Sequence, residues 1–162
     1  MKNSPKITIK KATASDVNLF WNFFEKSITN QFPEYSIKAR NHFLRKQYTK
    51  TNIKKWLKRK TGDLLLALNK KEIIGYLLAD RPYGGVAFIS WIAVDKKFQG
   101  QGIGSQLLKK YEIIAKKQKA HKIHLWADKR NLKFYEKNKW ILAGHIPKDY
   151  WEVDGWLFYK AI

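Results

Sequence analysis

The stretch from residue 88 to residue 115 constrains the fold of this 162-residue chain more than any other part of it. An apolar run rich in β-branched and aromatic residues ends at Val94, and a loop with alternating glycines follows. Apolar residues then recur at helical spacing from Ile103 to Ala115. The pattern predicts a strand, a tight loop and an amphipathic helix in succession.

The loop between the strand and the helix has the features of an anion site. Gly100, Gly102 and Gly104 alternate there, so the backbone can adopt positive φ angles and approach a ligand without interference from Cβ atoms. The first amides of the helix lack partners within the helix and point into the loop with the positive end of its dipole. We therefore predict a binding site for a pyrophosphate.

Two common nucleotide-binding motifs do not match this loop. A dinucleotide fingerprint places an acidic residue about 20 residues beyond its glycines, where this chain has His121 and Lys122. A P-loop requires Gly-Lys-Ser or Gly-Lys-Thr after a four-residue gap, and the sequence contains no such string. Both nucleotide-fold interpretations are excluded.

Two other strings point to a different family. Residues 99–104, Gln-Gly-Gln-Gly-Ile-Gly, fit a Gln/Arg-x-x-Gly-x-Gly/Ala loop position by position, and residues 131–140 are similar to a Phe-Tyr-Glu-Lys-x-Gly-Phe segment. With both motifs in this order, the chain resembles the GNAT (Gcn5-related N-acetyltransferase) family over roughly residues 6 to 160. The resemblance implies one GNAT domain over residues 1–162, of the α/β (α+β) class, with a mixed central sheet flanked by helices in the order βααβββαβαββ.

The residue patterns outside the motifs predict the same order of elements. The expected elements are a strand at 6–11, a helix from 13–15 to 28, a helix at 37–60 interrupted near 49–52, a hairpin at 64–79, a loop at 81–85, a strand at 122–127, a short helix at 131–138, and a final hairpin that turns at Asp154-Gly155.

The family resemblance assigns acetyl-coenzyme A as the acetyl donor. Its pyrophosphate would be held by the loop, and its pantetheine arm would pair with the end of the preceding strand, because a splayed strand leaves N–H and C=O groups that a ligand amide can fill. The implied cofactor-binding residues are Ile92, Ala93, Val94, Gln99, Gly100, Gln101, Gly102, Ile103, Gly104, Ser105 and Asn131.

Tyr135 is the catalytic residue that the resemblance implies, because its phenol would protonate the departing thiolate of coenzyme A. The alternative is a half-buried aromatic residue on a short amphipathic helix. The family often has an Asn seven residues before this Tyr, where this chain has Asp128. Asn131 either contacts the cofactor or only caps the short helix.

The acceptor side of the site is less defined by sequence. By resemblance, the loop with Glu34 and Tyr35 borders the acceptor cleft, although both residues could simply shape a turn. The positions where family branches carry a catalytic Glu are apolar here. The remaining candidates for a general base are Glu34, Asp80, Asp128, His145 and Glu152, or a water near Ser90. Without a dedicated base, an acceptor amine of low pKa is favoured, because more of it is unprotonated at neutral pH. This amine could belong to a small molecule or a protein.

The composition limits the chemistry and the location. The chain has no cysteine, which excludes disulfides, thiolate metal sites and a cysteine acyl-enzyme. We therefore expect direct attack by an amine in a ternary complex, with no metal in the site. Residues 1–6 and the strand that follows lack a signal-peptide pattern, and no apolar run is long enough to span a membrane. We expect a cytoplasmic monomer or homodimer without membrane contact.

The formal net charge of +20 is unevenly distributed. No acidic residue lies between Tyr35 and Gly62, whereas ten Lys and Arg residues lie within 38–60. This basic segment is either a solvated helical face or a contact surface for nucleic acid or the ribosome. The sequence thus leaves two functions: an acetyl-coenzyme A-dependent N-acetyltransferase acting on a primary amine, or a catalytically weak GNAT-like module that binds RNA or the ribosome through its basic second helix.

Overall fold

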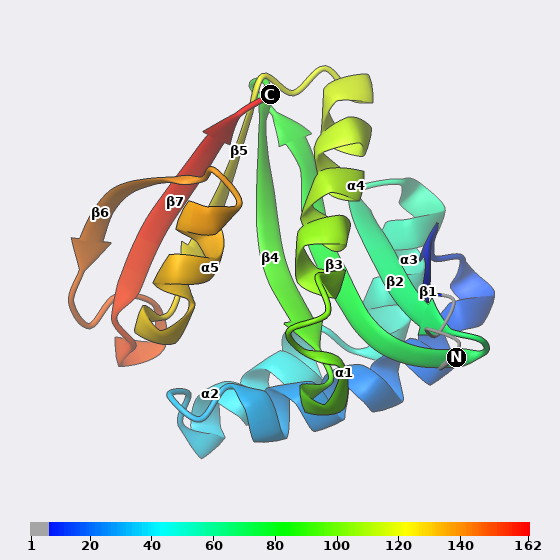
Figure 1. Ribbon diagram of the computed structural model, residues 1–162. Coiled ribbons are helices and arrows are strands. Elements are labelled where there is room, and N and C mark those ends of the chain that lie inside the picture. Colours follow the sequence, from blue (N-terminus) through cyan, green and yellow to red (C-terminus); the bar gives the residue numbers. More distant parts are fainter. Residues whose placement is uncertain (1–6) are drawn as a thin grey trace, which may run out of the picture.

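The structure, a computed structural model, describes residues 7–162 and contains one seven-stranded mixed sheet with helices on both faces (Figure 1). Residues 1–6, including the first residue of the predicted first strand, lie outside the described residues. The strands are β1 (Ile7–Lys11), β2 (Gly62–Asn69), β3 (Glu72–Tyr83), β4 (Val86–Val94), β5 (Lys122–Ala127), β6 (Ile141–Ile146) and β7 (Gly155–Ala161). The helices are α1 (Val17–Gln31), α2 (Ile37–His42), α3 (Lys50–Arg59), α4 (Ile103–Lys117) and α5 (Leu132–Lys137).

The strand order in the sheet is β1-β2-β3-β4-β5-β7-β6. Within residues 7–162, β4 and β5 form the parallel pair, and the other neighbouring strands are antiparallel. Helix α4 provides the crossover between β4 and β5, as a parallel pair requires. The predicted fold class and order of elements are confirmed, with the second predicted helix divided in two.

Two apolar cores lie on opposite faces of the sheet. In β2, Leu65 and Ala67 join a core with α4, whereas Leu64 and Leu66 join a core with α1 and α3. All four side chains are essentially buried because helices cover both faces. Figure 1 shows α4 on the near face of the sheet and α3 behind it.

The second predicted helix is interrupted where the sequence indicated. Helix α2 continues into a π-helical turn over residues 43–47, and the chain breaks at Tyr48 before α3 begins. The side-chain oxygen of Thr49 accepts a hydrogen bond of 3.2 Å from the Asn52 amide and so caps α3. The basic segment is therefore two short helices with a bend between them.

Two predicted turns are wrong. Strand β3 extends through residues 81–83, so the expected loop shrinks to the positive-φ pair Gly84-Gly85. The expected hairpin turn at Asp154-Gly155 is absent, and residues 147–154 form a longer connection with one 3₁₀ turn. Asp154 closes this connection by accepting a bond of 2.9 Å from the Lys148 amide. Gly155 allows close packing, because a Cβ there would lie 2.8 Å from the Trp126 ring.

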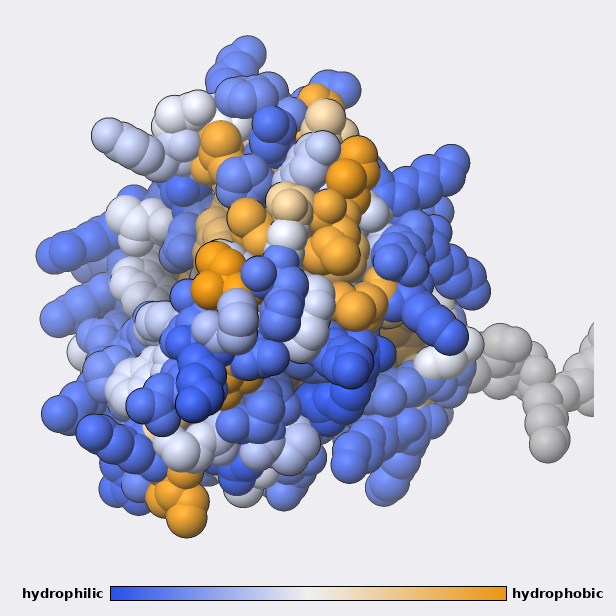
Figure 2. Space-filling view, turned by 90° about the vertical axis from the view of Figure 1, so that its left-hand side faces the viewer, coloured by the Kyte–Doolittle hydropathy of each residue, from blue (hydrophilic) through white to orange (hydrophobic). Residues whose placement is uncertain are grey.

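Strand β6 forms one edge of the sheet and is exposed along its length. Ile141, Leu142 and Ile146 each expose 41–54% of their surface, and Figure 2 shows apolar side chains gathered on this face between hydrophilic ones. Among the helices of residues 7–162, none combines the length and apolar character needed to cross a membrane.

Candidate active site

Strands β4 and β5 diverge at the centre of the sheet. Their parallel pairing ends at Ile89 and Leu125, yet β4 continues to Val94 while it remains paired with β3. The edge of β4 from Ser90 onward therefore has no strand beside it on the β5 side. Such an edge offers backbone N–H and C=O groups to a ligand.

A β-bulge at Ser90 marks the start of this divergence. Trp91 pairs with Leu78, and Ile89 pairs with Ala79, so Ser90 has no partner residue on β3. The extra residue shifts the alternation of side chains: Ala87 and Ile89 belong to the core with α4, whereas Trp91 and Ala93 belong to the core with α1. Because a bulge bends its strand and increases the twist, it accounts for the separation of β4 from β5.

The glycine loop lies at the far end of β4 and has free amides. Gly100 and Gly102 adopt φ angles of 78° and 77°, which favour glycine. Among the loop and cap hydrogen bonds of residues 7–162, no amide from Gly100 to Ser105 is a donor. The first bond into α4 runs from the Gln106 amide to the Gly102 carbonyl at 3.0 Å. The predicted anion site therefore has unpaired donors.

The side chain of Gln99 ties this loop back to the strand. Its Nε2 donates a hydrogen bond of 2.9 Å to the carbonyl oxygen of Val94. Gly104 fits closely on the other side, because a Cβ there would lie 3.0 Å from the Phe134 ring. The loop is thus held between β4 and α5 while its outer amides stay open.

A cavity of about 450 Å³ lies at the divergence of β4 and β5. Its walls come from the α1–α2 loop, the bend before α3, β3, β4, β5, α5 and the connection from β6 to β7. Eight of its twenty-two lining residues are aromatic and five are carboxylic acids. The acids are Glu34, Asp80, Asp128, Asp149 and Asp154.

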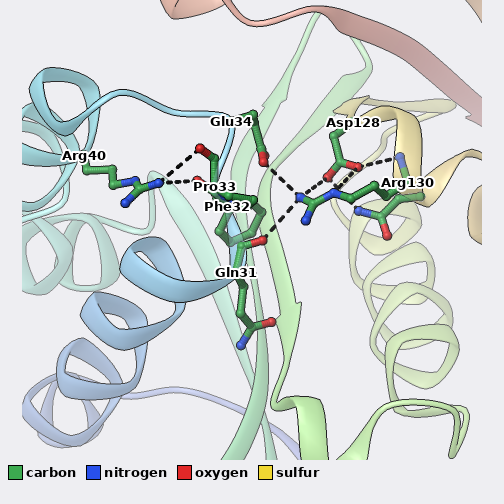
Figure 3. Close-up of polar contacts among 8 residues, drawn as sticks. Gln31, Phe32, Pro33, Glu34, Arg40, Asp128 and Arg130 are labelled. Carbon is green, nitrogen blue, oxygen red and sulfur yellow. Dashed lines mark hydrogen bonds and ion pairs between the residues drawn. The ribbon is translucent and has the colours of Figure 1, made fainter.

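Arg130 joins two of these acids across the cavity wall (Figure 3). Its Nη2 lies 2.9 Å from Oε2 of Glu34 and 3.2 Å from Oδ2 of Asp128, and it also donates to the Gln31 carbonyl at 3.3 Å. Burial raises the pKa of Glu34, and Asp128 adds to this effect while Arg130 opposes it. The contact links the α1–α2 loop to the segment that follows β5.

Asp80 differs from these paired acids. Its Oδ2 accepts a hydrogen bond of 3.2 Å from the hydroxyl of Ser90, the bulge residue. Within residues 7–162, no Lys, Arg or His nitrogen lies within ion-pair distance of Asp80. Burial raises the pKa of this carboxyl group above its usual value. A carboxylate of raised basicity therefore contacts the residue at the strand divergence.

Tyr135 lies on α5 with its ring packed among Phe134, Trp140 and Phe158. Only 5% of the residue is exposed, and it lines the cavity. The hydroxyl makes no hydrogen bond with the described residues. Burial raises the pKa of the phenol, so it stays protonated at neutral pH.

Comparison with known proteins identifies the fold. The family model described as the acetyltransferase (GNAT) family matches residues 21–140. The chain belongs to the GNAT acetyltransferase family. This confirms the resemblance inferred from the two sequence motifs.

Several solved structures share the GNAT fold. A PaiA N-acetyltransferase from Thermoplasma acidophilum, in complex with coenzyme A, has a TM-score of 0.81 and 19% identity over 97% of this chain and 99% of its own. A GNAT acetyltransferase from Streptococcus pneumoniae has a TM-score of 0.78 and 19% identity, with the same shares covered. A ribosomal-protein-alanine N-acetyltransferase from Brucella melitensis has a TM-score of 0.74 and 17% identity over 96% of this chain and 99% of its own.

The GNAT fold brings several of the predicted site residues together. Tyr135, Asn131, Ile92, Glu34 and Tyr35 all line the cavity. The predicted residues from Ala93 to Ser105 do not line it and lie along β4 and the loop beyond. Asn131 occupies the N-cap position of α5, but its side chain makes no cap bond and instead donates to Oδ2 of Asp128 at 2.9 Å.

Only some of the candidates for a general base line the cavity. Asp80, Asp128 and Glu34 line the cavity, but His145 and Glu152 do not. His145 instead lies 3.1 Å from Asp154 and is stacked on Trp156.

The residues of the cavity wall that sequence reasoning missed include Tyr48, Trp91, Asp149 and Tyr150. The sequence contained a signal for Asp149 and Tyr150. The chain has only 13 acidic residues, and Asp149 stands beside two aromatic residues between predicted strands.

Proposed function

We propose that the chain is an acetyl-coenzyme A-dependent N-acetyltransferase that transfers an acetyl group to a primary amine by direct attack in a ternary complex. The observation that carries this proposal is the unpaired edge of β4, which leads from a cavity at Ser90 to a loop with free amides. An extended thioester with a diphosphate at one end fits such an arrangement. The coenzyme A complex of the Thermoplasma acidophilum relative supports the choice of donor.

The donor is bound by backbone groups in this proposal. Amides from Gly100 to Ser105 hold the diphosphate at the N-terminus of α4. The edge of β4 from Ile92 to Val94 pairs with the amides of the pantetheine arm as a further strand would. Gln99 already occupies the Val94 carbonyl, so the pairing uses the other groups of this edge.

The reaction requires the amine to lose two protons and the thiolate to gain one. The protonated amine gives one proton to Asp80, directly or through a water held near Ser90, and its nitrogen then attacks the thioester carbonyl. The C–N bond forms, the C–S bond breaks, and the second N–H proton passes through water to the phenolate that Tyr135 becomes once it has protonated the thiolate. Tyr135 protonates the thiolate, so the products are an N-acetylated amine, coenzyme A and one released proton.

Asp80 is the base in this scheme because the other candidates are occupied or remote. Arg130 pairs with both Glu34 and Asp128, so their carboxylate oxygens are already engaged. His145 and Glu152 do not line the cavity.

Coenzyme A release, measured with a panel of primary amines, tests the proposed function. In Tyr135→Phe, we expect kcat to fall by about 100-fold with unchanged acetyl-coenzyme A binding, because a proton donor is removed. Tyr83→Phe is the control, since Tyr83 is 93% exposed. Wild-type turnover in Tyr135→Phe would remove Tyr135 from the mechanism. Absence of both binding and release would contradict the function itself.

A second function, polyanion binding, is favoured by the exposure of the basic segment. In α3, Ile53 is buried while Lys54, Lys55, Lys58 and Arg59 are exposed. Binding of RNA should weaken steeply with salt and should be lost when these four residues are reversed to Glu. Unchanged RNA binding by that variant would exclude α3 as the contact surface.

A further inference from the structure

The lining of the cavity has the opposite charge to the rest of the protein. The chain has 33 Lys and Arg residues and 13 acids, yet five of those acids line this one space. None of the twenty-two lining residues of the described chain is Lys, Arg or His. A cavity of this kind selects a cation.

Three of the five acids already have partners. Glu34 and Asp128 pair with Arg130, and Asp154 accepts from the Lys148 amide and pairs with His145.

The other two acids have no basic partner within residues 7–162. The carboxylate of Asp80 accepts only the bond from Ser90, and the carboxylate of Asp149 makes no hydrogen bond or ion pair with the described residues. Asp80 belongs to β3, whereas Asp149 belongs to the connection between β6 and β7. They come from different walls of the cavity.

One buried donor of the cavity wall lacks an acceptor within the described residues. Trp91 lines the cavity and is 7% exposed, and its Nε1 has no acceptor in the described chain. Buried donors of this kind are normally satisfied.

Aromatic side chains complete the wall near Asp149. Tyr150 exposes 55% of its surface and Trp126 exposes 38%. Aromatic faces attract alkylammonium groups when these are withdrawn from water. The surroundings of Asp149 therefore suit a cation on an alkyl chain.

Acetyl transfer removes the charge of the attacking amine, so a second unpaired acid in the cavity needs a second cation as its partner. The attacking amine is neutral when its nitrogen attacks, so its proton has passed to the base and its charge no longer attracts a carboxylate. Asp149 then needs a cation that stays protonated. We propose that the acceptor is a small aliphatic diamine or oligoamine, with its reactive nitrogen near Asp80 and a second ammonium against Asp149 and Tyr150. This inference rests on the proposed acetyltransferase function.

Three four-carbon amines test this proposal by differing only at the far end: butylamine, putrescine and γ-aminobutyrate. We expect kcat/KM for coenzyme A release to be about 10- to 100-fold higher with putrescine than with butylamine, because the second ammonium gains a charged hydrogen bond. γ-Aminobutyrate should be the poorest substrate, because its carboxylate meets Asp149. Equal rates with butylamine and putrescine would overturn the proposal.

The Asp149→Asn variant tests whether Asp149 binds the second ammonium group of the acceptor. The ratio of kcat/KM for putrescine to kcat/KM for butylamine, both measured with this variant, should fall to about fivefold or less, the range left by weak exposed charges. Glu72→Gln is the matched control, because it removes one charge from the exposed first residue of β3 and should keep the full preference. A full preference in Asp149→Asn would overturn the assignment.

Calorimetry separates this inference from the function on which it rests. Putrescine is titrated into the protein saturated with coenzyme A, which cannot react, and its affinity is compared with that of butylamine. Tighter putrescine binding supports the inference even if turnover is absent, and equal or weaker binding overturns it. Failure to bind coenzyme A in the first titration contradicts the proposed function instead.

Discussion

The outer surface of the basic segment and the cavity differ in charge, although the bend before α3 contributes to both. Residues 38–60 carry ten Lys and Arg residues and no acid, whereas the cavity wall has five acids and no basic residue in the described chain. The net charge of +20 therefore describes the exterior of this protein and not its site. Charge composition alone would have indicated an acidic partner for every surface.

The two regions can act independently because charges are screened over short distances. The Debye length is about 8 Å at physiological ionic strength, so exposed lysines on α3 contribute little inside a cavity lined by carboxylates. A cationic acceptor is then selected by the groups that touch it. The basic exterior remains available for the anionic donor or for another anionic partner.

The largest expected effect comes from the unpaired acid next to Ser90. We expect Asp80→Asn to lower kcat by about 10²- to 10⁴-fold, because the base that accepts the amine proton is lost. Burial raises the pKa of Asp80 above 3.8, so wild-type activity persists above that raised pKa and falls as the pH drops through it.

The pH profile of kcat/KM measures this effect directly. The Asp80→Asn variant should lack the acidic limb, whereas Ser90→Ala should retain it. An Asp80→Asn variant with wild-type kcat would show that the cavity acids only bind the acceptor.

A smaller effect is expected at Arg130, which contacts both Glu34 and Asp128 (Figure 3). Its side chain is 54% exposed, so Arg130→Gln should lower the free energy of unfolding by about 1 kcal/mol or less. The KM for putrescine should also fall, because two acids lose their counter-charge.

Thermal unfolding and steady-state kinetics check this prediction. Arg45→Gln is the control, because Arg45 is exposed and forms no ion pair with the described residues. A higher KM for putrescine in Arg130→Gln would contradict the electrostatic account of the cavity.

The smallest effect on catalysis is expected from the basic exterior. Reversal of Lys54, Lys55, Lys58 and Arg59 to Glu should change kcat/KM for putrescine by less than about twofold at physiological salt, because these charges lie outside the cavity and are screened. The same variant should lose RNA binding if the surface has that function. A large change in putrescine turnover would show that the two regions are coupled.

Local sequence patterns were sufficient to predict the donor side of the site. The change from an apolar strand to glycines and then to helical spacing is encoded within residues 88–115, and the loop, α4 and the free amides follow from it. The interruption near Thr49 was also predictable, since cap-forming residues act on their own helix.

The remaining features depend on partners that are distant in the sequence. The bulge at Ser90 is defined by its pairing with β3, and Arg130 meets Glu34 across 96 positions. The wrong turn at Gly155 has the same cause, because that glycine is needed for packing against Trp126 and not for a local turn. Acidic residues from separate segments form one cavity wall only after the sheet has formed.

Calorimetric titration of acetyl-coenzyme A into the wild type and Gly102→Glu tests the central claim most directly. Gly102 has a φ of 77°, so a side chain there is strained, and a carboxylate would repel the diphosphate. Gly144→Glu is the matched control, because a Cβ at Gly144 meets nothing within 4 Å and its φ is not in the positive range. We predict that Gly102→Glu loses affinity by about 100-fold or more while Gly144→Glu binds as the wild type does. Wild-type affinity in Gly102→Glu would contradict the account.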